Sequence, residues 1–431
     1  MLVFVEPYWR PAALGLLLLI GMVIADLLIP RLTQRVIDMG INEQNMSTII
    51  TTSLMMLGAA VLSALFAIGN TILSVRVGQN VSADLRSALV RKVQTFSFAN
   101  LDQLQTGELL VRTTSDVNQV QMIVMMSLRI LTRAPLWMLG SVVMLILTSP
   151  RLALLMAFLA PLILAMVWFF ASRARPLFRT VQEKLDRLNQ VLQENLAGAR
   201  VVKAFVRAEH ENERFERTNQ DLTERTTQVM RLLATLLPTM ILVLNLGIVG
   251  VIWFGGNLAI AGELTEGEIV ASINYLAYSL FPILMMGMMI GPLSAADASA
   301  GRIWEVLDTT PEVQERPRAE APAQIRGQLA FEGVCFSYDG ADCHDAVLKD
   351  VDLAAAPGEK LAILGATGSG KSSLIHLIPR FYDVSEGRVT LGGVDVRDLP
   401  LKTLRDRVGI ALQETVLFSG TIRDNIRYGR P

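Results

Sequence analysis

Long stretches without a charged side chain dominate the first three hundred residues. A bilayer core about 30 Å thick needs about 20 apolar helical residues, and buried helices of soluble proteins seldom stay uncharged over that length. Five uncharged runs, of 32, 17, 21, 31 and 28 residues, cover 44–75, 134–150, 152–172, 232–262 and 269–296, and a sixth apolar stretch from Pro11 is broken only by Asp26. We therefore predict a membrane α-helical protein with six transmembrane helices, at about 11–37, 50–75, 130–148, 152–172, 232–258 and 268–292.

The basic residues predict the orientation of these helices. Seven lysines and arginines lie between the uncharged runs 44–75 and 134–150, and twelve lie between 152–172 and 232–262, whereas the short loops on the opposite side carry only Arg151. Cytoplasmic loops carry the excess of positive charge. We expect a multi-pass protein of the cell's inner membrane, with both long connections and both termini in the cytoplasm.

The long connections predict helices rather than flexible loops. Within 177–195 and 209–231, apolar residues recur every three or four positions, which is the period of a helix with one buried face. The fourth and fifth helices should therefore continue well beyond the membrane as a cytoplasmic hairpin. Its turn is expected near 199–207, and the equivalent turn of the first hairpin near 99–107.

Overall composition narrows the class of protein. Hydrophobic residues make up 52% of the chain and charged residues 18%, below the roughly 25% of a typical soluble domain, which argues against an ordinary cytosolic enzyme. The formal net charge of −1 argues against a partner that is a nucleic acid. Cys335 and Cys343 are too few for a disulfide framework, and no histidine and cysteine cluster has zinc-site spacing, so no metal or redox role is predicted.

The character of the sequence changes after Asp308. A segment rich in proline and charge predicts a linker at 305–328. Short strand-like runs follow, at 329–338, 360–364, 388–391 and 408–412, and they alternate with turns and one helix. This pattern predicts the beginning of an α/β domain.

The residues from Gly365 to Ser372 carry the clearest chemistry of the chain. They read GATGSGKS, which matches GxxxxGK[ST] between an apolar run and a predicted helix. Glycines let backbone N–H groups surround phosphates, and the start of the helix adds partial positive charge. Lys371 should reach the β- and γ-phosphates, and Ser372 should ligate Mg²⁺. The motif predicts a P-loop that binds ATP or GTP with Mg²⁺.

The order of these features resembles an ABC exporter half-transporter of the multidrug type. In addition to the P-loop, 334–338 (VCFSY) resembles the adenine-stacking strand of that family, 408–413 (VGIALQ) its Q-loop, and 417–426 the segment after it. The resemblance covers the whole chain. It implies a membrane domain at 1–304, the linker at 305–328, and the N-terminal part of an α/β P-loop nucleotide-binding domain at 329–431.

The resemblance also implies the roles of individual residues. Tyr338 would stack on adenine, unless it is an ordinary aromatic residue at a strand end. Gln413 would contact Mg²⁺ and the attacking water, unless it is a solvated turn residue. The hairpin turns would dock on the nucleotide domains near Gln413. The remaining ATP-binding residues are Gly365, Ala366, Thr367, Gly368, Ser369, Gly370, Lys371, Ser372 and Ser373.

The sequence departs from the family pattern at its end. After the Q-loop segment it has no second acidic motif, no LSGGQ-like signature and no switch histidine before Pro431. The family's catalytic glutamate belongs to that acidic motif. We therefore expect a truncated chain with no catalytic residue of its own and no ATP hydrolysis by itself.

Three residues are candidates for a substrate path through the membrane. Asp26 lies within the first predicted helix, where a charge is costly; it is expected to contact a cationic substrate, to form an ion pair that steadies a cavity, or to reach polar groups near a kink. Met285 and Met289 belong to a methionine-rich stretch that could repack around varied apolar ligands, or serve packing and lipid contact.

These features together predict ATP-driven export of apolar, drug-like or lipid substrates across the cytoplasmic membrane, with the lipid bilayer as the surrounding partner. Each ATP of the family is held between two chains, so a second half-transporter is the expected partner, identical or different. Two alternatives remain: an importer of metal chelates on the same fold, and a membrane-anchored P-loop kinase or nucleotide sensor.

Overall fold

The computed structural model of the chain describes residues 2–104, 106–316, 325, 327–339, 342–413 and 416–429. Contacts divide the chain into two compact units. The first, the membrane unit, combines Met1–Leu85 with Val117–Ala300. The second, the nucleotide unit, combines Arg86–Asp116 with Gly301–Pro431. The second unit therefore unites two segments that are far apart in the sequence.

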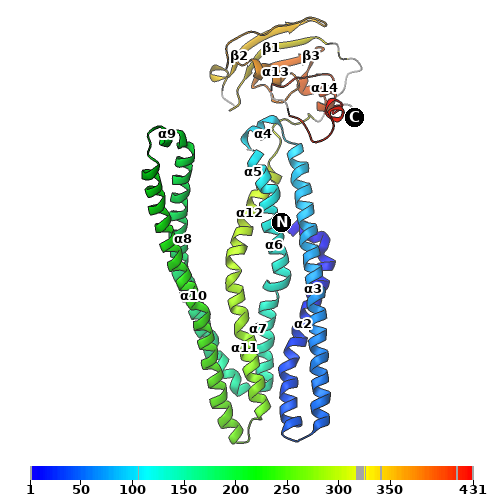
Figure 1. Cartoon of the computed structure of the whole chain (residues 1–431). Helices are drawn as coiled ribbons and strands as arrows, with labels where there is room; N and C mark the ends of the chain where they lie inside the picture. The colour runs from blue at the N-terminus through cyan, green and yellow to red at the C-terminus, as the bar shows by residue number, and fades with distance from the viewer. Residues whose placement is uncertain are drawn as a thin grey trace. The chain divides into compact units, whose positions relative to one another are not determined.

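Helices make up nearly all of the membrane unit (Figure 1). Its main elements are α2 (Trp9–Arg35), η2 (Val36–Ile41), α3 (Met46–Gln94), α6 (Val117–Met126), η4 (Ser127–Leu131), α7 (Arg133–Thr148), α8 (Pro150–Ala197), α9 (Ala199–Ala204), α10 (Ala208–Ile260), α11 (Glu266–Met288) and α12 (Ile290–Asp308), and the short α1 (Leu2–Val5) and η1 (Glu6–Tyr8) precede them. The first residues of α3 and of α12 lie in this unit, and the last residues of both helices lie in the nucleotide unit.

Five helical stretches of the described residues are long and apolar enough to cross a bilayer. They are Val3–Ile41, Met46–Gln94, Thr106–Thr148, Pro150–Ala197 and Ala208–Ile260, and they contain the first five predicted transmembrane helices. The sixth prediction, at 268–292, falls on α11 and the start of α12. Several side chains there lie outside the described residues, and this span stays a prediction.

The long helices continue beyond their apolar spans, as the sequence predicts. At 1.5 Å per residue, the 48 and 53 residues of α8 and α10 give lengths of about 70–80 Å, more than twice the bilayer core. Figure 1 shows the two helices side by side, with α9 at their shared end. Polar pairs join them along this region, including Lys184 with Asp221 at 2.6 Å and Arg214 with Glu194 at 2.5 Å.

The three short loops of the membrane unit are bonded to one another. The Asp38 carboxylate accepts hydrogen bonds from the Thr265 hydroxyl (2.7 Å) and from the Gly267 backbone N–H (2.9 Å). Arg151 forms an ion pair with Glu263. A Cβ atom on Gly267 would lie 2.6 Å from the Asp38 carboxylate, so only glycine permits this approach. The loops therefore close one end of the helical bundle.

Apolar side chains from α2, α7, α8, α10 and α11 form the core of the membrane unit. Leu145, Leu152, Ile163 and Leu276 are fully buried within it. Tyr275 is buried there as well, and its hydroxyl donates to the Leu27 carbonyl at 2.9 Å. That bond satisfies the one polar group of a large core side chain.

The nucleotide unit contains a four-stranded antiparallel sheet of order β2-β1-β3-β4. Its strands are β1 (Leu329–Phe336), β2 (Leu348–Ala355), β3 (Glu386–Leu391) and β4 (Val394–Asp395). Its helices are α4 (Phe98–Gln103), α5 (Thr106–Val111), η3 (Arg112–Asp116), η5 (Cys343–Asp345), α13 (Lys371–Leu377), η6 (Val396–Asp398), α14 (Leu401–Arg405) and α15 (Ile422–Ile426).

Two of the predicted strands are wrong. Residues 329–338 and 388–391 correspond to β1 and β3, but 360–364 and 408–412 have no regular structure. Leu364 is 91% exposed, so the apolar run before the P-loop covers no core here. A strand needs a hydrogen-bonded neighbour, and within the described residues neither run pairs with another strand. The predicted linker is partly helical at its start, and 317–324 and 326 lie outside the described residues.

Cys335 and Cys343 form a disulfide with a Cα–Cα distance of 5.4 Å. The pair brackets Tyr338 in the sequence. Their sulfur atoms and a Glu386 carboxylate oxygen lie within 4.8 Å of one another. The sequence does not predict this pairing, because the two cysteines have no motif context beyond their spacing.

Candidate nucleotide-binding site

Glycines give the P-loop a conformation that other residues would resist. Gly368 and Gly370 both have a φ of +85°, in the left-handed region where side chains are strained. A Cβ atom on Gly370 would also lie 2.8 Å from the Leu348 side chain, and one on Gly365 would lie 2.7 Å from the Ser369 hydroxyl. The turn therefore depends on glycine both for its backbone angles and for space.

Lys371 is the first residue of α13, directly after the loop, and its ammonium group folds back over it. The Nζ atom donates to the Gly365 carbonyl (3.0 Å), the Ala366 carbonyl (2.7 Å) and the Ser369 hydroxyl (3.3 Å). The positive charge therefore lies against the loop, at the place where phosphates would bind. Ser372 follows on α13 with an exposed side chain, open to an Mg²⁺ ion.

Tyr338 lies beside the helix that follows the P-loop. Its hydroxyl is 2.9 Å from the Ser373 hydroxyl, and its ring meets Phe336 and Tyr382 edge-on at 4.8 and 5.2 Å between centroids. The side chain is nevertheless 46% exposed, which leaves part of the ring open for stacking. The structure thus brings Tyr338, on the segment after β1, together with the P-loop.

Gln413 is not joined to this group. It lies in an exposed bend, next to residues 414 and 415, which fall outside the described part of the chain. Among the described hydrogen bonds, none links it to Ser372 or to the P-loop. Its role as a ligand of Mg²⁺ is not tested by the structure.

Helix α4, at the turn of the first predicted hairpin, belongs to the nucleotide unit and packs there against the residues that follow α13. The Phe98 ring stacks on Phe381 at 4.0 Å, and the Tyr382 hydroxyl donates to the Asp102 carboxylate at 2.5 Å. Asn100 adds hydrogen bonds to the Thr310 carbonyl (3.2 Å) and from the Glu312 N–H (3.1 Å). Within the described residues the contact lies at Phe381 and Tyr382 rather than near Gln413, where the sequence predicts docking.

The sequence does not predict the residues that join α4 to the segment after α13, which are Phe98, Phe381 and Tyr382. The only signal is that aromatic residues interrupt otherwise polar turns, at FSFAN near 96–100 and RFYD at 380–383. Burial and the hydrogen-bonded Asp102 carboxylate raise the pKa of Tyr382. The hydroxyl therefore remains a hydrogen-bond donor across the physiological pH range. Because Tyr382 also touches Tyr338, contacts run continuously from Asp102 to the P-loop.

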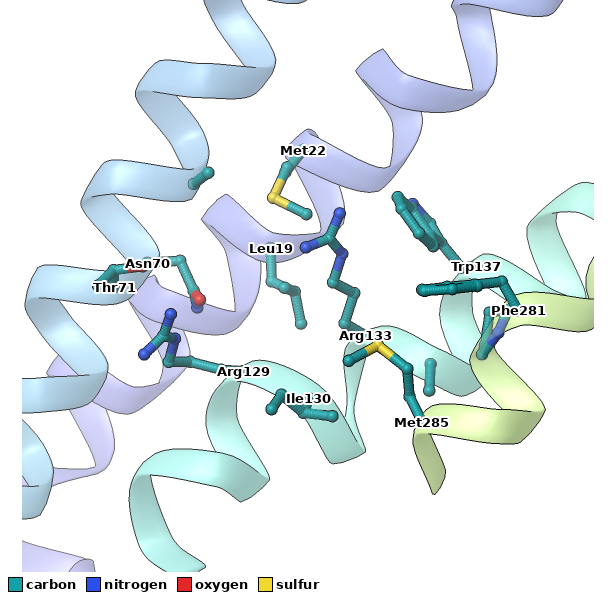
Figure 2. A pocket seen from close by; sticks show the side chains of 13 residues that line it. Leu19, Met22, Asn70, Thr71, Arg129, Ile130, Arg133, Trp137, Phe281 and Met285 are labelled. Carbon is teal, nitrogen blue, oxygen red and sulfur yellow. The ribbon is translucent and has the colours of Figure 1, made fainter. Parts of the chain in front are cut away.

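The substrate-path candidates lie in the membrane unit. Asp26 accepts a hydrogen bond from the Ser63 hydroxyl at 2.5 Å, and its other oxygen lies 3.6 Å from Arg133. Of the alternatives raised by the sequence, the structure thus provides a basic partner for Asp26. Met285 lines a cavity between helices (Figure 2). Met289 lies at the break between α11 and α12 and is absent from the described lining of that cavity.

Comparison with known families covers both parts of the chain. Residues 12–283 match the ABC transporter transmembrane region, and residues 348–430 match the ABC transporter family domain. The chain therefore belongs to the ABC transporter family, as a transmembrane region fused to an ATP-binding domain. Family membership makes it a membrane protein and implies ATP binding, and ATPase activity is a property of that family.

Several relatives align over most of the chain. It is 36% identical over 432 residues to an uncharacterized ABC transporter ATP-binding protein, YfiB of Bacillus subtilis, a match that spans 99% of this chain and 74% of the relative. Identity is 35% over 426 residues with the uncharacterized ABC transporter ATP-binding protein MT1311 of Mycobacterium tuberculosis, spanning 99% and 73%. A fatty acid ABC transporter ATP-binding/permease protein of Mycobacterium bovis is 35% identical over 353 residues, spanning 82% and 55%.

Replacing Tyr338 with alanine is expected to weaken ATP binding about tenfold. Base stacking on an aromatic ring contributes about 1–3 kcal/mol, and tenfold corresponds to about 1.4 kcal/mol. Tyr338→Phe keeps the ring and loses only the Ser373 contact, so its loss should be smaller. Titration with a fluorescent ATP analogue, displaced by ATP, measures both. Unchanged affinity in Tyr338→Ala would make Tyr338 an ordinary aromatic residue at a strand end.

Proposed function

We propose that the protein exports apolar, drug-like or lipid-like molecules across the cytoplasmic membrane, driven by ATP and Mg²⁺. The observation that carries the proposal is that one chain contains membrane-spanning helices and a P-loop, with α4 packed on the residues that follow α13. Such an arrangement can convert a change at the nucleotide into a movement of helices.

The site residues take separate roles in this proposal. Lys371 holds the β- and γ-phosphates, Ser372 and Gln413 ligate Mg²⁺, and Tyr338 stacks on adenine. The remaining P-loop residues from Gly365 to Ser373 supply backbone N–H groups and hydroxyls around the phosphates. When bound, Mg²⁺ neutralises phosphate charge.

The proposed organisation follows the sequence prediction. We infer a membrane domain at 1–304, a linker at 305–328 and the nucleotide-binding part at 329–431, with both termini in the cytoplasm of an inner-membrane protein. The bonds among the three short loops support placing them together on the outer face. A second half-transporter completes the assembly, because exporters of this kind hold each ATP between two chains.

The class of substrate has independent support. A relative whose name gives fatty acid as its substrate is 35% identical over 82% of this chain. Export of a lipid-like molecule suits the cavities within the membrane unit, whose walls are mostly apolar. Family membership leaves no reason to retain the kinase or sensor alternative.

Transport direction tests the proposal. Inverted membrane vesicles that contain this chain assembled with an ATPase-competent second half-transporter should accumulate a radiolabelled long-chain fatty acid when Mg-ATP is added outside, and vesicles in which this chain carries Lys371→Ala should not. Right-side-out vesicles loaded with ATP should lose the same molecule. ATP-driven accumulation by right-side-out vesicles instead would establish import, and the proposal of export would be wrong.

A further inference from the structure

A cavity of about 290 Å³ lies between α2, α3, η4, α7 and α11 of the membrane unit. Figure 2 shows its lining side chains, and Arg129 and Arg133 project into it from neighbouring turns of η4 and α7. The other described lining residues are neutral, so two cations line the cavity without an acid. Leu19, Met22, Phe281 and Met285 make much of the remaining wall apolar.

Arg133 is only partly satisfied by its neighbours. Its NH2 group lies 3.6 Å from Asp26, within range of an ion pair but too far for a good hydrogen bond. Its guanidinium carbon lies 4.0 Å from the centre of the Trp137 ring. The Arg133 Nε and the Trp137 Nε1 are both buried and have no hydrogen-bond partner. Two buried donors without acceptors are costly, and a ligand with acceptor atoms would relieve that cost.

Arg129 adds a second positive charge. Its side chain is exposed, and no acid in the described part of the chain forms an ion pair with it. It lies four residues before Arg133, across the π-helical segment η4, an irregularity that is frequent at functional sites. Asp26 balances one arginine, and the other stays uncompensated. Within this partly apolar cavity the excess charge attracts an anion and repels a cation.

A second cavity, of about 350 Å³, adjoins the first. Trp137 and Phe281 line both cavities. Beyond them the wall consists almost entirely of apolar side chains, among them Leu237 and Met240 of α10. Tyr278 of this cavity stacks on Trp137 at 5.4 Å, the ring that Arg133 contacts on the basic side. The first cavity, which contains the two arginines, and the second, apolar cavity therefore meet at Trp137.

We propose that the two cavities together bind one amphiphile with an anionic headgroup. A carboxylate or phosphate would accept hydrogen bonds from Arg129, from Arg133 and from the Trp137 Nε1, and the acyl tail would occupy the apolar cavity. This inference rests on the proposed function and names the class of molecule that is exported. It assigns Asp26 to orienting Arg133 rather than to contacting a cationic substrate.

Binding is tested without ATP, with the protein in nanodiscs of phosphatidylcholine, which has no net charge. Tritiated oleate at pH 8 is the probe, and oleyl phosphate, oleyl alcohol and oleylamine compete for its site. Oleate or oleyl phosphate is expected to bind at least tenfold more tightly than the alcohol, and the amine should compete least. The ranking of the two acids identifies the headgroup.

Amino-acid substitutions distinguish the effect of charge on oleate binding from an effect on folding. Arg129→Gln should weaken oleate binding about tenfold and Arg129→Lys much less, since lysine keeps the charge. Arg173→Gln is the control for Arg129→Gln, because Arg173 is also an exposed arginine of the membrane unit but is not among the residues that line either cavity. Asp26→Asn keeps the size of the side chain but removes the negative charge that competes with an anion for Arg133, so it should strengthen oleate binding.

Arg133→Gln alone leaves Asp26 without its basic partner and can impair folding, so it is combined with Asp26→Asn. The double variant should still lose about tenfold in oleate affinity. Ala277→Phe, which fills the apolar cavity, should weaken oleate more than decanoate, because a shorter tail needs less space.

Equal binding of oleate and oleyl alcohol, with no effect of Arg129→Gln, would overturn the proposal. Tightest binding of oleylamine, lost in Asp26→Asn, would overturn it in favour of a cationic substrate. These results are independent of the transport test. If oleate binds as expected but ATP does not drive its transport, only the proposed export is contradicted. If ATP drives transport equally for anionic and neutral amphiphiles, only the anionic site is contradicted.

Discussion

Replacing Lys371 with alanine is expected to weaken ATP binding at least a hundredfold and to reduce ATP-driven transport to background. The Lys371 ammonium lies over the P-loop, bonded to the Gly365 and Ala366 carbonyls. Phosphates that enter the loop would meet this charge directly, and a hundredfold loss corresponds to about 2.7 kcal/mol, within the range of a charge-assisted contact. Displacement of a fluorescent ATP analogue measures the affinity.

The matched control is Lys349→Ala. Lys349 is an exposed lysine on β2 of the same unit and takes no part in the P-loop. Its removal changes the net charge equally and should leave ATP binding unaltered. If both variants bound ATP like the unaltered protein, the P-loop would not be the nucleotide site, and the proposed function would lose its energy source.

Phe98→Ala is expected to reduce ATP-driven transport about tenfold while ATP affinity changes less than twofold. The Phe98 ring stacks on Phe381 and is one of the contacts between the first hairpin and the segment after α13. Among the ring contacts of the described residues, Phe98 has none with a P-loop residue, so its loss should interrupt transmission and leave ATP binding intact. The two readouts are vesicle accumulation and displacement of the ATP analogue.

Phe96→Ala is the control for this prediction, because Phe96 is also aromatic and lies two residues earlier, and no ring contact of the described residues involves it. Cross-linking adds an independent measurement. Cysteines in an Asp102→Cys, Tyr382→Cys double variant should be joined by a bifunctional thiol reagent rather than by a direct disulfide, because the Tyr382 side chain, bonded to Asp102 through its terminal hydroxyl, separates the two backbones by more than a disulfide spans. Normal transport by Phe98→Ala, or failure of this cross-link, would show that the α4 contact does not transmit.

Local patterns predict the membrane helices and the P-loop well, and for a physical reason. An uncharged run of 20 or more residues can be stable only in a bilayer or a core, and GxxxxGK[ST] places its chemistry within eight residues. Five of six predicted spans correspond to apolar helices of the structure, and the P-loop lies directly before α13.

Local sequence patterns do not predict contacts between residues that are far apart in the sequence. The runs at 360–364 and 408–412 have strand composition, but composition does not provide a hydrogen-bonded neighbour. Likewise the sequence shows that Asp26 carries a charge within a span, but not that Arg133, more than a hundred residues later, lies beside it. The bond between Asp102 and Tyr382 spans 280 positions of sequence and has no periodic signal.

The division of the nucleotide unit between Arg86–Asp116 and Gly301–Pro431 has a consequence for biosynthesis. A ribosome makes the first segment long before the second, and domains generally fold as units during synthesis from the N-terminal end. Phe98 and Asn100 are therefore synthesised before their partners, and they lack these contacts until Phe381 and Glu312 have left the ribosome. The hairpin turn then acts as a template on which the later segment completes its fold, so membrane insertion of the early helices precedes and guides assembly of the ATP-binding part.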